Sequence, residues 1–202
     1  MSGKDAPSAK RLFSIGHSNQ DTDALLSLLK EHGVEVVVDV RSSPHSAYAS
    51  QFDREPLEAA LKRAGLKYLF LGKELGGHPD DPSWYDADGH VVYERVAGSS
   101  RFLEGIERLE RGVEKFRVAI LCSEENPARC HRRLLVSRVL ASRGIAVDHI
   151  RGDGRVQTED ELKIEETGGQ GDLFEGLEDG TTWRRSTQSV SRRKRRPSSS
   201  DR

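Results

Sequence analysis

Residues 34–40 read VEVVVDV, a run of valines that holds one carboxylate near each end. β-Branched residues favour strands, and an almost uninterrupted apolar run is typical of a strand that is buried on both faces. Such burial occurs mainly in parallel sheets that helices cover on both sides. The run therefore predicts an α/β fold in which this strand lies inside the sheet.

Segments with helical periodicity flank this run. Residues 21–33 and 53–65 each place leucines on one face and end in a glycine that can adopt a left-handed stop, Gly33 and Gly65. Further strands are predicted at 12–16, 67–72, 116–122 and 145–150, and further helices at 99–112 and 130–144. Strands that alternate with helices predict right-handed crossovers. We expect one Rossmann-like or flavodoxin-like three-layer domain with a mainly parallel sheet of about five strands.

The charges divide the chain into a body and a tail. Residues 1–154 carry 22 basic and 23 acidic side chains, residues 155–180 carry 2 and 9, and residues 181–202 carry 8 and 1. We therefore expect a flexible N-terminus at 1–10, an α/β domain at 11–154 and a largely disordered tail at 155–202, with a short helix near 158–166.

The composition indicates the cellular compartment in which the protein works. The apolar runs are far shorter than the roughly 20 residues that a membrane span needs, and residues 1–10 lack the apolar core of a secretory signal. The chain has only two cysteines. We expect a cytoplasmic protein with free thiols and no membrane contact.

Polar residues follow the predicted strands, where ligands of parallel sheets usually bind. His17 could act as a general acid or base, and Ser18 could bind an anion or cap the turn. Asp39 and Arg41 lie two residues apart in an extended segment and therefore share a face. They form either a structural pair or a site at which Arg41 clamps a phosphate or carboxylate. Glu74, before two glycines, could hold its carboxylate close to a ligand.

The segment CSEENPARCHRR (122–133) carries the remaining candidates. Cys122 ends a predicted strand and is either a nucleophile or an ordinary packed thiol. Cys130 and His131 begin the next predicted helix, where backbone N–H groups attract anions, and Arg132 extends that positive end. These residues predict a site for an anionic substrate.

A metal site is not predicted, nor is any cofactor. Seven residues separate Cys122 from Cys130, unlike the usual zinc knuckle, and the chain has no second cysteine pair. His17 or His149 could complete a ligand set only through the fold.

Five segments together, SIGHSN, VVVDVRSSPHS, QFD, LGKELGG and LCSEENPARCHRRLLVSRVL, closely resemble the bacterial Domain of Unknown Function 488 family over residues 12–150. The resemblance implies an α/β domain with one site but supplies no reaction. The residues that it places around this site are His17, Ser18, Asp39, Arg41, Glu74, Cys122, Glu124, Cys130, His131 and Arg132.

Two segments of the tail indicate candidate macromolecular partners. QGDLF (170–174) resembles the pentapeptide that binds the bacterial sliding clamp, in which Leu173 and Phe174 would fill an apolar cleft while Gln170 bonds to its rim. The basic run at 184–196 could bind a nucleic acid backbone. Both segments could instead contact the domain itself.

Three hypotheses follow. The first is an enzyme, a hydrolase or transferase, that acts on a nucleotide or nucleic-acid-related anion, with His17, Glu74 and Cys122 as catalytic groups and a role in DNA maintenance. The second is a sulfur carrier that uses Cys122, since VVVDVRS and AILCSEENPARCHR resemble the layout of rhodaneses. The third is a non-catalytic adaptor that binds the clamp or DNA. The sequence leaves the oligomeric state open.

Overall fold

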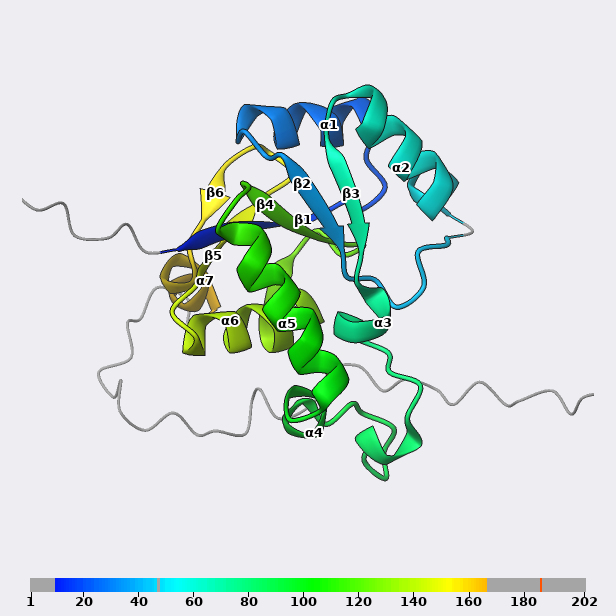
Figure 1. Cartoon of the computed structure of the whole chain (residues 1–202), viewed down its shortest axis with the longest axis vertical. Helices are drawn as coiled ribbons and strands as arrows, with labels where there is room; N and C mark the ends of the chain where they lie inside the picture. The colour runs from blue at the N-terminus through cyan, green and yellow to red at the C-terminus, as the bar shows by residue number, and fades with distance from the viewer. Residues whose placement is uncertain (1–9, 47, 167–185, 187–202) are drawn as a thin grey trace, which may run out of the picture.

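The computed structural model describes residues 10–46, 48–166 and 186 (Figure 1). Its strands and α-helices are, in chain order, β1 (Arg11–Gly16), α1 (Thr22–Glu31), β2 (Val36–Asp39), α2 (Arg54–Arg63), β3 (Lys67–Phe70), α3 (Gly72–Leu75), α4 (Tyr93–Ala97), α5 (Ser100–Val113), β4 (Val118–Cys122), α6 (Arg138–Ser142), β5 (Ala146–Ile150), β6 (Val156–Gln157) and α7 (Glu159–Glu166). Short 3₁₀ turns lie at Ser50–Phe52, Pro82–Trp84 and Pro127–Arg129, and a π-helix at Arg132–Ser137.

The strands form one sheet in the order β3-β2-β4-β1-β5-β6. Neighbours among the first five are parallel, and β6 pairs antiparallel with β5. All four residues of β2 are buried, as the valine run predicts. The α/β class and the mainly parallel sheet are therefore confirmed. The strand order is neither of the two usual doubly wound orders, so the flavodoxin-like detail is not confirmed.

Helices cover both faces of the sheet (Figure 1). One face packs against α1 and α2 through residues such as Leu25 and Leu57. The other packs against α5 and α6 through Phe102, Ile106 and Leu140. These two apolar clusters, one on each side of the sheet, make the core of a three-layer domain and fix the strand ends that carry the polar residues.

The glycine stops of the first two helices are confirmed, whereas the helix expected at 130–144 has a different form. Gly33 and Gly65 have φ of 62° and 83°, the left-handed stops that the sequence predicts. The helix expected at 130–144 is instead the π-helix followed by α6. The Ser137 hydroxyl donates to the Arg132 carbonyl at 2.7 Å within this π-helix. Because a π-turn holds an extra residue, it changes which side chains point inward.

The folded region continues past the expected boundary at residue 154. Strand β6 and helix α7 occupy 156–166, and Leu162 of α7 is buried. The short helix expected near 158–166 is thus present, but it packs on the domain and is not part of a loose tail. Among the described residues, no helix is long and apolar enough to cross a membrane.

Candidate functional site

Strand register brings the predicted residues to one edge of the sheet. Gly16 at the end of β1 lies opposite Cys122 at the end of β4, and Asp39 at the end of β2 lies opposite Leu121. His17 directly follows β1. The carboxyl ends of β1, β2 and β4 therefore converge as expected for a ligand site in a parallel sheet.

Asp39 and Arg41 form a buried, bidentate ion pair. Arg41 donates from Nε to Asp39 Oδ1 at 2.9 Å and from Nη2 to Oδ2 at 2.6 Å, and its backbone N–H also donates to Oδ1 at 3.0 Å. The residues are 0 % and 5 % exposed. Burial lowers the pKa of Arg41, but the hydrogen bonds and charge of Asp39 outweigh it, so the pKa is raised overall. Of the two predicted roles, the structure shows the ion pair.

This pair belongs to a longer chain of contacts. The Tyr68 hydroxyl donates to Asp39 Oδ2 at 2.9 Å, and Arg41 Nη1 donates to His17 Nε2 at 3.0 Å. His17 Nδ1 in turn donates to the Ser18 carbonyl at 2.7 Å. These contacts assign the neutral form of His17 with its proton on Nδ1, and burial, as the main cause, lowers its pKa. Both ring nitrogens of His17 thus have protein partners.

Two further predicted residues, Ser18 beside His17 and Glu74 in the loop after β3, are not part of this chain of contacts. Ser18 has a left-handed φ of 49° and directs its hydroxyl to Asn19 at 3.4 Å. Glu74 pairs with Arg108 at 3.2 Å and borders a small cleft of about 50 Å³ with Lys73 and His78. The Ser18 hydroxyl is therefore bound to its neighbour in the chain, and the Glu74 carboxylate is paired with a residue of α5.

The cysteines meet at a histidine. Cys122 Sγ lies 3.8 Å from His131 Nδ1, and Cys130 Sγ lies 3.9 Å from the same nitrogen. Cys122 is 4 % and Cys130 is 1 % exposed, and both are free thiols. His131 Nε2 donates to the Val40 carbonyl at 3.1 Å. We call Cys122, Cys130 and His131 the cysteine cluster.

The surroundings of the two thiols shift their pKa values in opposite directions. A hydrogen bond from Cys130 is the largest influence on Cys122; with His131 and Arg132 it outweighs burial and holds the Cys122 pKa well below its ordinary value. Burial and the neighbouring Cys122 raise the pKa of Cys130. For His131, burial opposes protonation, but Cys122 outweighs it and raises the pKa. Cys122 is therefore the more acidic thiol.

Arg132 holds the loop that carries the cluster. It is fully buried and donates from Nη1 and Nη2 to the carbonyls of Glu124 and Glu125, at 2.5 and 2.6 Å, and from Nε to Ser14 Oγ at 3.3 Å. A Cβ at Gly16 would lie 1.7 Å from the Glu124 carbonyl oxygen, so the loop needs glycine there. The predicted substrate-binding Arg132 is instead bound to protein groups.

Glu124 lies beside the cluster. The residue is largely exposed, but its carboxyl group is partly desolvated, and this burial together with the charge of Cys122 raises its pKa. Only the family resemblance indicated this residue from the sequence. The residue that sequence reasoning missed is Tyr68, which binds Asp39. Gly77 of the third loop lies against the cluster, since an added Cβ there would lie 2.7 Å from the His131 ring.

Among the residues that the structure describes, the cysteine cluster is the group that could hold a metal ion. The ligand atoms of Cys122, Cys130 and His131 all lie within 4.8 Å of one another. The expectation of no metal rested on the cysteine spacing and on the positions of His17 and His149. Those two histidines contact other partners, Ser18 and Ser14. The histidine that lies at both sulfurs is His131, which directly follows Cys130 in the chain.

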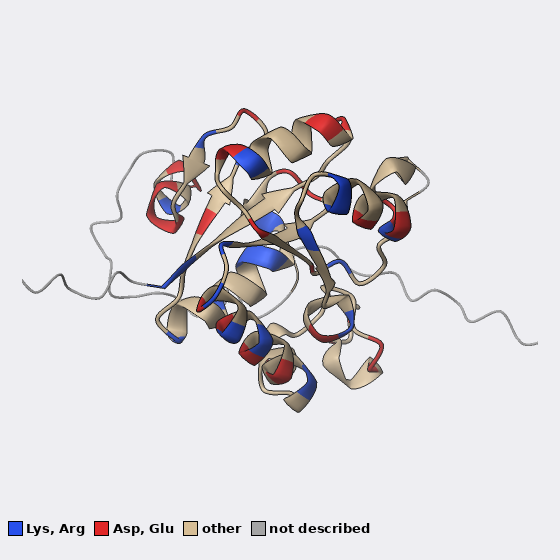
Figure 2. Cartoon of the chain, turned by 45° about the horizontal axis from the view of Figure 1, so that its top comes forward, with Lys and Arg blue, Asp and Glu red and all other residues tan. Residues whose placement is uncertain are grey.

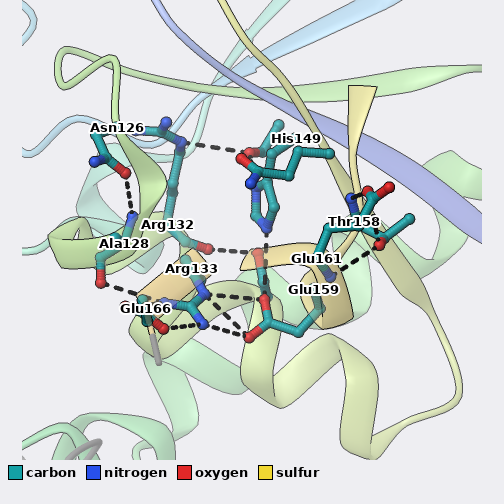
Figure 3. A network of polar contacts seen from close by, with 12 residues as sticks. Asn126, Ala128, Arg132, Arg133, His149, Thr158, Glu159, Glu161 and Glu166 are labelled. Atoms are coloured by element: carbon teal, nitrogen blue, oxygen red, sulfur yellow. Dashed lines mark hydrogen bonds and ion pairs between the residues drawn. The ribbon is translucent and has the colours of Figure 1, made fainter. Parts of the chain in front are cut away.

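A second polar network joins the π-helix to β5 and α7 (Figure 3). Arg133 donates to Glu159 at 2.8 Å and to Glu166 at 2.9 Å, so it joins both ends of α7 to the domain. His149 Nδ1 contacts Ser14 Oγ at 2.6 Å, and its Nε2 lies 3.6 Å from the Glu159 carboxylate. We call Arg133, His149, Glu159 and Glu166 the ionic network.

The predicted partner-binding residues Gln170, Leu173 and Phe174 lie outside the described residues. Within the basic run at 184–196 only Ser186 is described. Its backbone N–H donates to the Val91 carbonyl at 2.8 Å, and its hydroxyl accepts from the Val91 N–H at 3.0 Å. Ser186 thus docks beside α4.

Of the comparisons with known proteins, the family model alone identifies a family for this chain. A crystal structure of a DUF442 protein from Shewanella putrefaciens CN-32, provisionally named a phosphatase, is 18 % identical, with 67 % of each chain covered and a TM-score of 0.37. No curated protein matches the chain. The model of the family described as "Domain of unknown function DUF488" matches residues 21–139. The chain therefore belongs to the DUF488 family.

Proposed function

We propose that this chain is an enzyme, a hydrolase or transferase, whose reaction takes place at the cysteine cluster. One observation carries the proposal: Cys122, Cys130 and His131 direct their heteroatoms at one another at the carboxyl edge of the sheet. Sulfur and imidazole are the groups through which proteins attack, transfer protons or bind metals. The surrounding polar residues support this cluster, since Arg41 and Arg132 are bound to protein atoms.

We further propose an anionic substrate. Because Arg41 and Arg132 are occupied, we assign the anion to the small cleft, where Lys73 offers a positive charge and the neutral ring of His78 offers a hydrogen-bond donor. His78 lies close enough to His131 and Cys122 for their charges to influence its pKa, which burial chiefly lowers. In this proposal the two arginines position the site and the cleft binds the substrate.

The test is a screen of chromogenic phosphate esters and nucleotides with the purified full chain. We expect turnover that falls at least about 100-fold in Cys122→Ser and in His131→Asn, the range typical of lost acid–base or nucleophilic catalysis. The control is His45→Asn, which changes an exposed histidine paired with Asp53. Unchanged turnover in both cluster variants would contradict the proposal. A single added sulfur on Cys122 in the mass spectrum would instead favour the sulfur carrier.

We also propose that the tail brings the domain to DNA, by the sliding clamp through 170–174 and by nucleic acid through 184–196. The support is the sequence alone. Along α5, acidic and basic residues alternate, which does not suit a phosphate backbone, so we assign nucleic acid to the tail (Figure 2). Capture on immobilised clamp should fail for Leu173→Ala with Phe174→Ala. Capture that persists in this double variant argues against the clamp peptide, and clamp binding without any turnover would favour the adaptor.

A further inference from the structure

The dimensions of the cysteine cluster match those of a tetrahedral metal site. With typical zinc–sulfur and zinc–nitrogen bonds of about 2.3 and 2.0–2.1 Å, a sulfur and a nitrogen at two corners of a tetrahedron are about 3.6 Å apart. The two sulfur–Nδ1 separations are 3.8 and 3.9 Å. All three ligand atoms lie within 4.8 Å of one another. Small side-chain movements would bring them onto one ion.

The orientation of His131 is the one that metal-binding histidines adopt. Its Nε2 faces the Val40 carbonyl, which can only accept a hydrogen bond, so the ring proton must sit on Nε2. In the neutral ring, Nδ1 then carries the lone pair, and Nδ1 faces both sulfurs. Histidine ligands almost always donate their second ring N–H to such a carbonyl or to a carboxylate, which fixes the tautomer and the ring direction.

The loop explains how an unusual spacing produces a compact site. Asn126 Oδ1 accepts from the Ala128 N–H at 2.9 Å and caps the 3₁₀ turn at Pro127–Arg129. Arg132 binds the carbonyls of Glu124 and Glu125 from the other side. The chain therefore leaves β4 at Cys122 and returns to it at Cys130. This return replaces the short knuckle by which two cysteines usually reach one zinc ion.

The chemistry of the three ligands selects the kind of ion. Two thiolates neutralise a divalent cation, and sulfur with imidazole suits thiophilic metals such as zinc, whereas magnesium and calcium prefer oxygen. Structural zinc sites have four protein ligands, and catalytic sites have three and leave one position for water or substrate. The described residues supply three.

We propose that Cys122, Cys130 and His131 together bind one thiophilic divalent metal ion, of the class of Zn²⁺, with a fourth position open to water or substrate. This inference deepens the proposed function, because it names what the cluster holds. It can be tested without an activity, so failure of one proposal does not imply failure of the other.

The experiment uses the full chain without a histidine tag, in reducing buffer, titrated with Co²⁺ as a coloured probe and with Zn²⁺ against a chromophoric chelator. We expect one Co²⁺ per chain with thiolate-to-metal charge-transfer absorption in the near ultraviolet. We also expect Zn²⁺ to displace Co²⁺ and to protect both cysteines from alkylation by iodoacetamide. Loss of a partner that only orients a ligand weakens metal binding about 10–100-fold, so removal of a ligand should cost at least about 100-fold.

Three variants each remove one ligand: Cys122→Ser, Cys130→Ser and His131→Asn. The matched control is His45→Asn, outside the cluster, which should bind Co²⁺ like the wild type. Circular dichroism checks that every variant is folded. Substoichiometric Co²⁺ binding by folded wild type, binding that survives in His131→Asn, or alkylation that Zn²⁺ does not slow would each overturn the proposal. Metal binding without turnover would leave the metal site standing and contradict only the enzyme.

Discussion

The cysteine cluster and the ionic network meet at the start of the π-helix, where two residues only two positions apart belong to different regions. His131 turns to the cysteines, and Arg133 turns to α7. In the ionic network Arg133 makes hydrogen bonds to both Glu159 and Glu166, and His149 Nε2, which has no hydrogen-bond partner among the described residues, still faces the Glu159 carboxylate at 3.6 Å. In the cluster, two sulfurs and one nitrogen lone pair face one another. Paired polar groups hold the structure, and convergent lone pairs indicate a site where something else binds.

The largest effect on stability is expected from replacing Arg132, which lies between His131 of the cysteine cluster and Arg133 of the ionic network. Replacing it in Arg132→Met leaves the carbonyls of Glu124 and Glu125 without their donors. Hydrogen bonds to a charged group contribute about 1.5–3 kcal/mol each, so we expect a loss of at least about 3 kcal/mol. Denaturant unfolding measures it.

The same replacement at an exposed position of α2, Arg63→Met, is the control and should change stability by less than about 0.5 kcal/mol. If Arg132→Met cost no more than Arg63→Met, the buried guanidinium would not be what holds the cluster's loop.

A smaller loss is expected for Arg133→Met, on the side of the ionic network. Its partners Glu159 and Glu166 are 41 % and 43 % exposed, so solvent screens both ion pairs. Each should contribute about 0.5–1 kcal/mol, and their loss should release α7 locally. Hydrogen exchange should speed up in α7 and stay unchanged in β4. Unchanged exchange in α7 would show that Leu162 alone anchors the helix.

The ionic network should also weaken in acid. Burial alone would raise the pKa of Glu159, but the nearby His149 ring and the hydrogen bonds and charge of Arg133 outweigh it and lower the pKa from 4.5 to about 2. The lowered pKa means that Glu159 stabilises the fold fully above pH 4.5. This contribution is lost progressively as the pH falls toward about 2. Unfolding curves across this range should be flatter with pH in Glu159→Gln than in the wild type; equal slopes would contradict the assignment.

The smallest effect on stability is expected in the cluster itself. Cys130→Ala removes one buried sulfur in metal-free protein and should cost about 1 kcal/mol or less, similar to one methylene. The same variant should bind the metal at least about 100-fold more weakly, as expected for the loss of one ligand. Chemical denaturation in a chelating, reducing buffer tests the first statement. A loss as large as that of Arg132→Met would assign the cluster a structural role.

Particular residues show how far the sequence predicts the site. The two-residue spacing of Asp39 and Arg41 places them on one face of an extended segment, and they do pair. Tyr68 was missed because its contact with Asp39 requires β3 to lie beside β2, and strand order has no local signal. His131 was assigned only to a helix N-terminus because a regular helix was expected, whereas the segment forms a π-helix.

The sequence by itself determined the α/β class, the residues at the carboxyl ends of the strands and the stops at Gly33 and Gly65, because hydrophobic periodicity and backbone sterics act over a few neighbouring residues. Tertiary structure decided which lone pairs converge. Cys122 and Cys130 are eight positions apart, and only the capped loop, the Arg132 tether and the Val40 carbonyl bring His131 to both sulfurs. Such contacts depend on strand order and loop closure, which no short segment encodes.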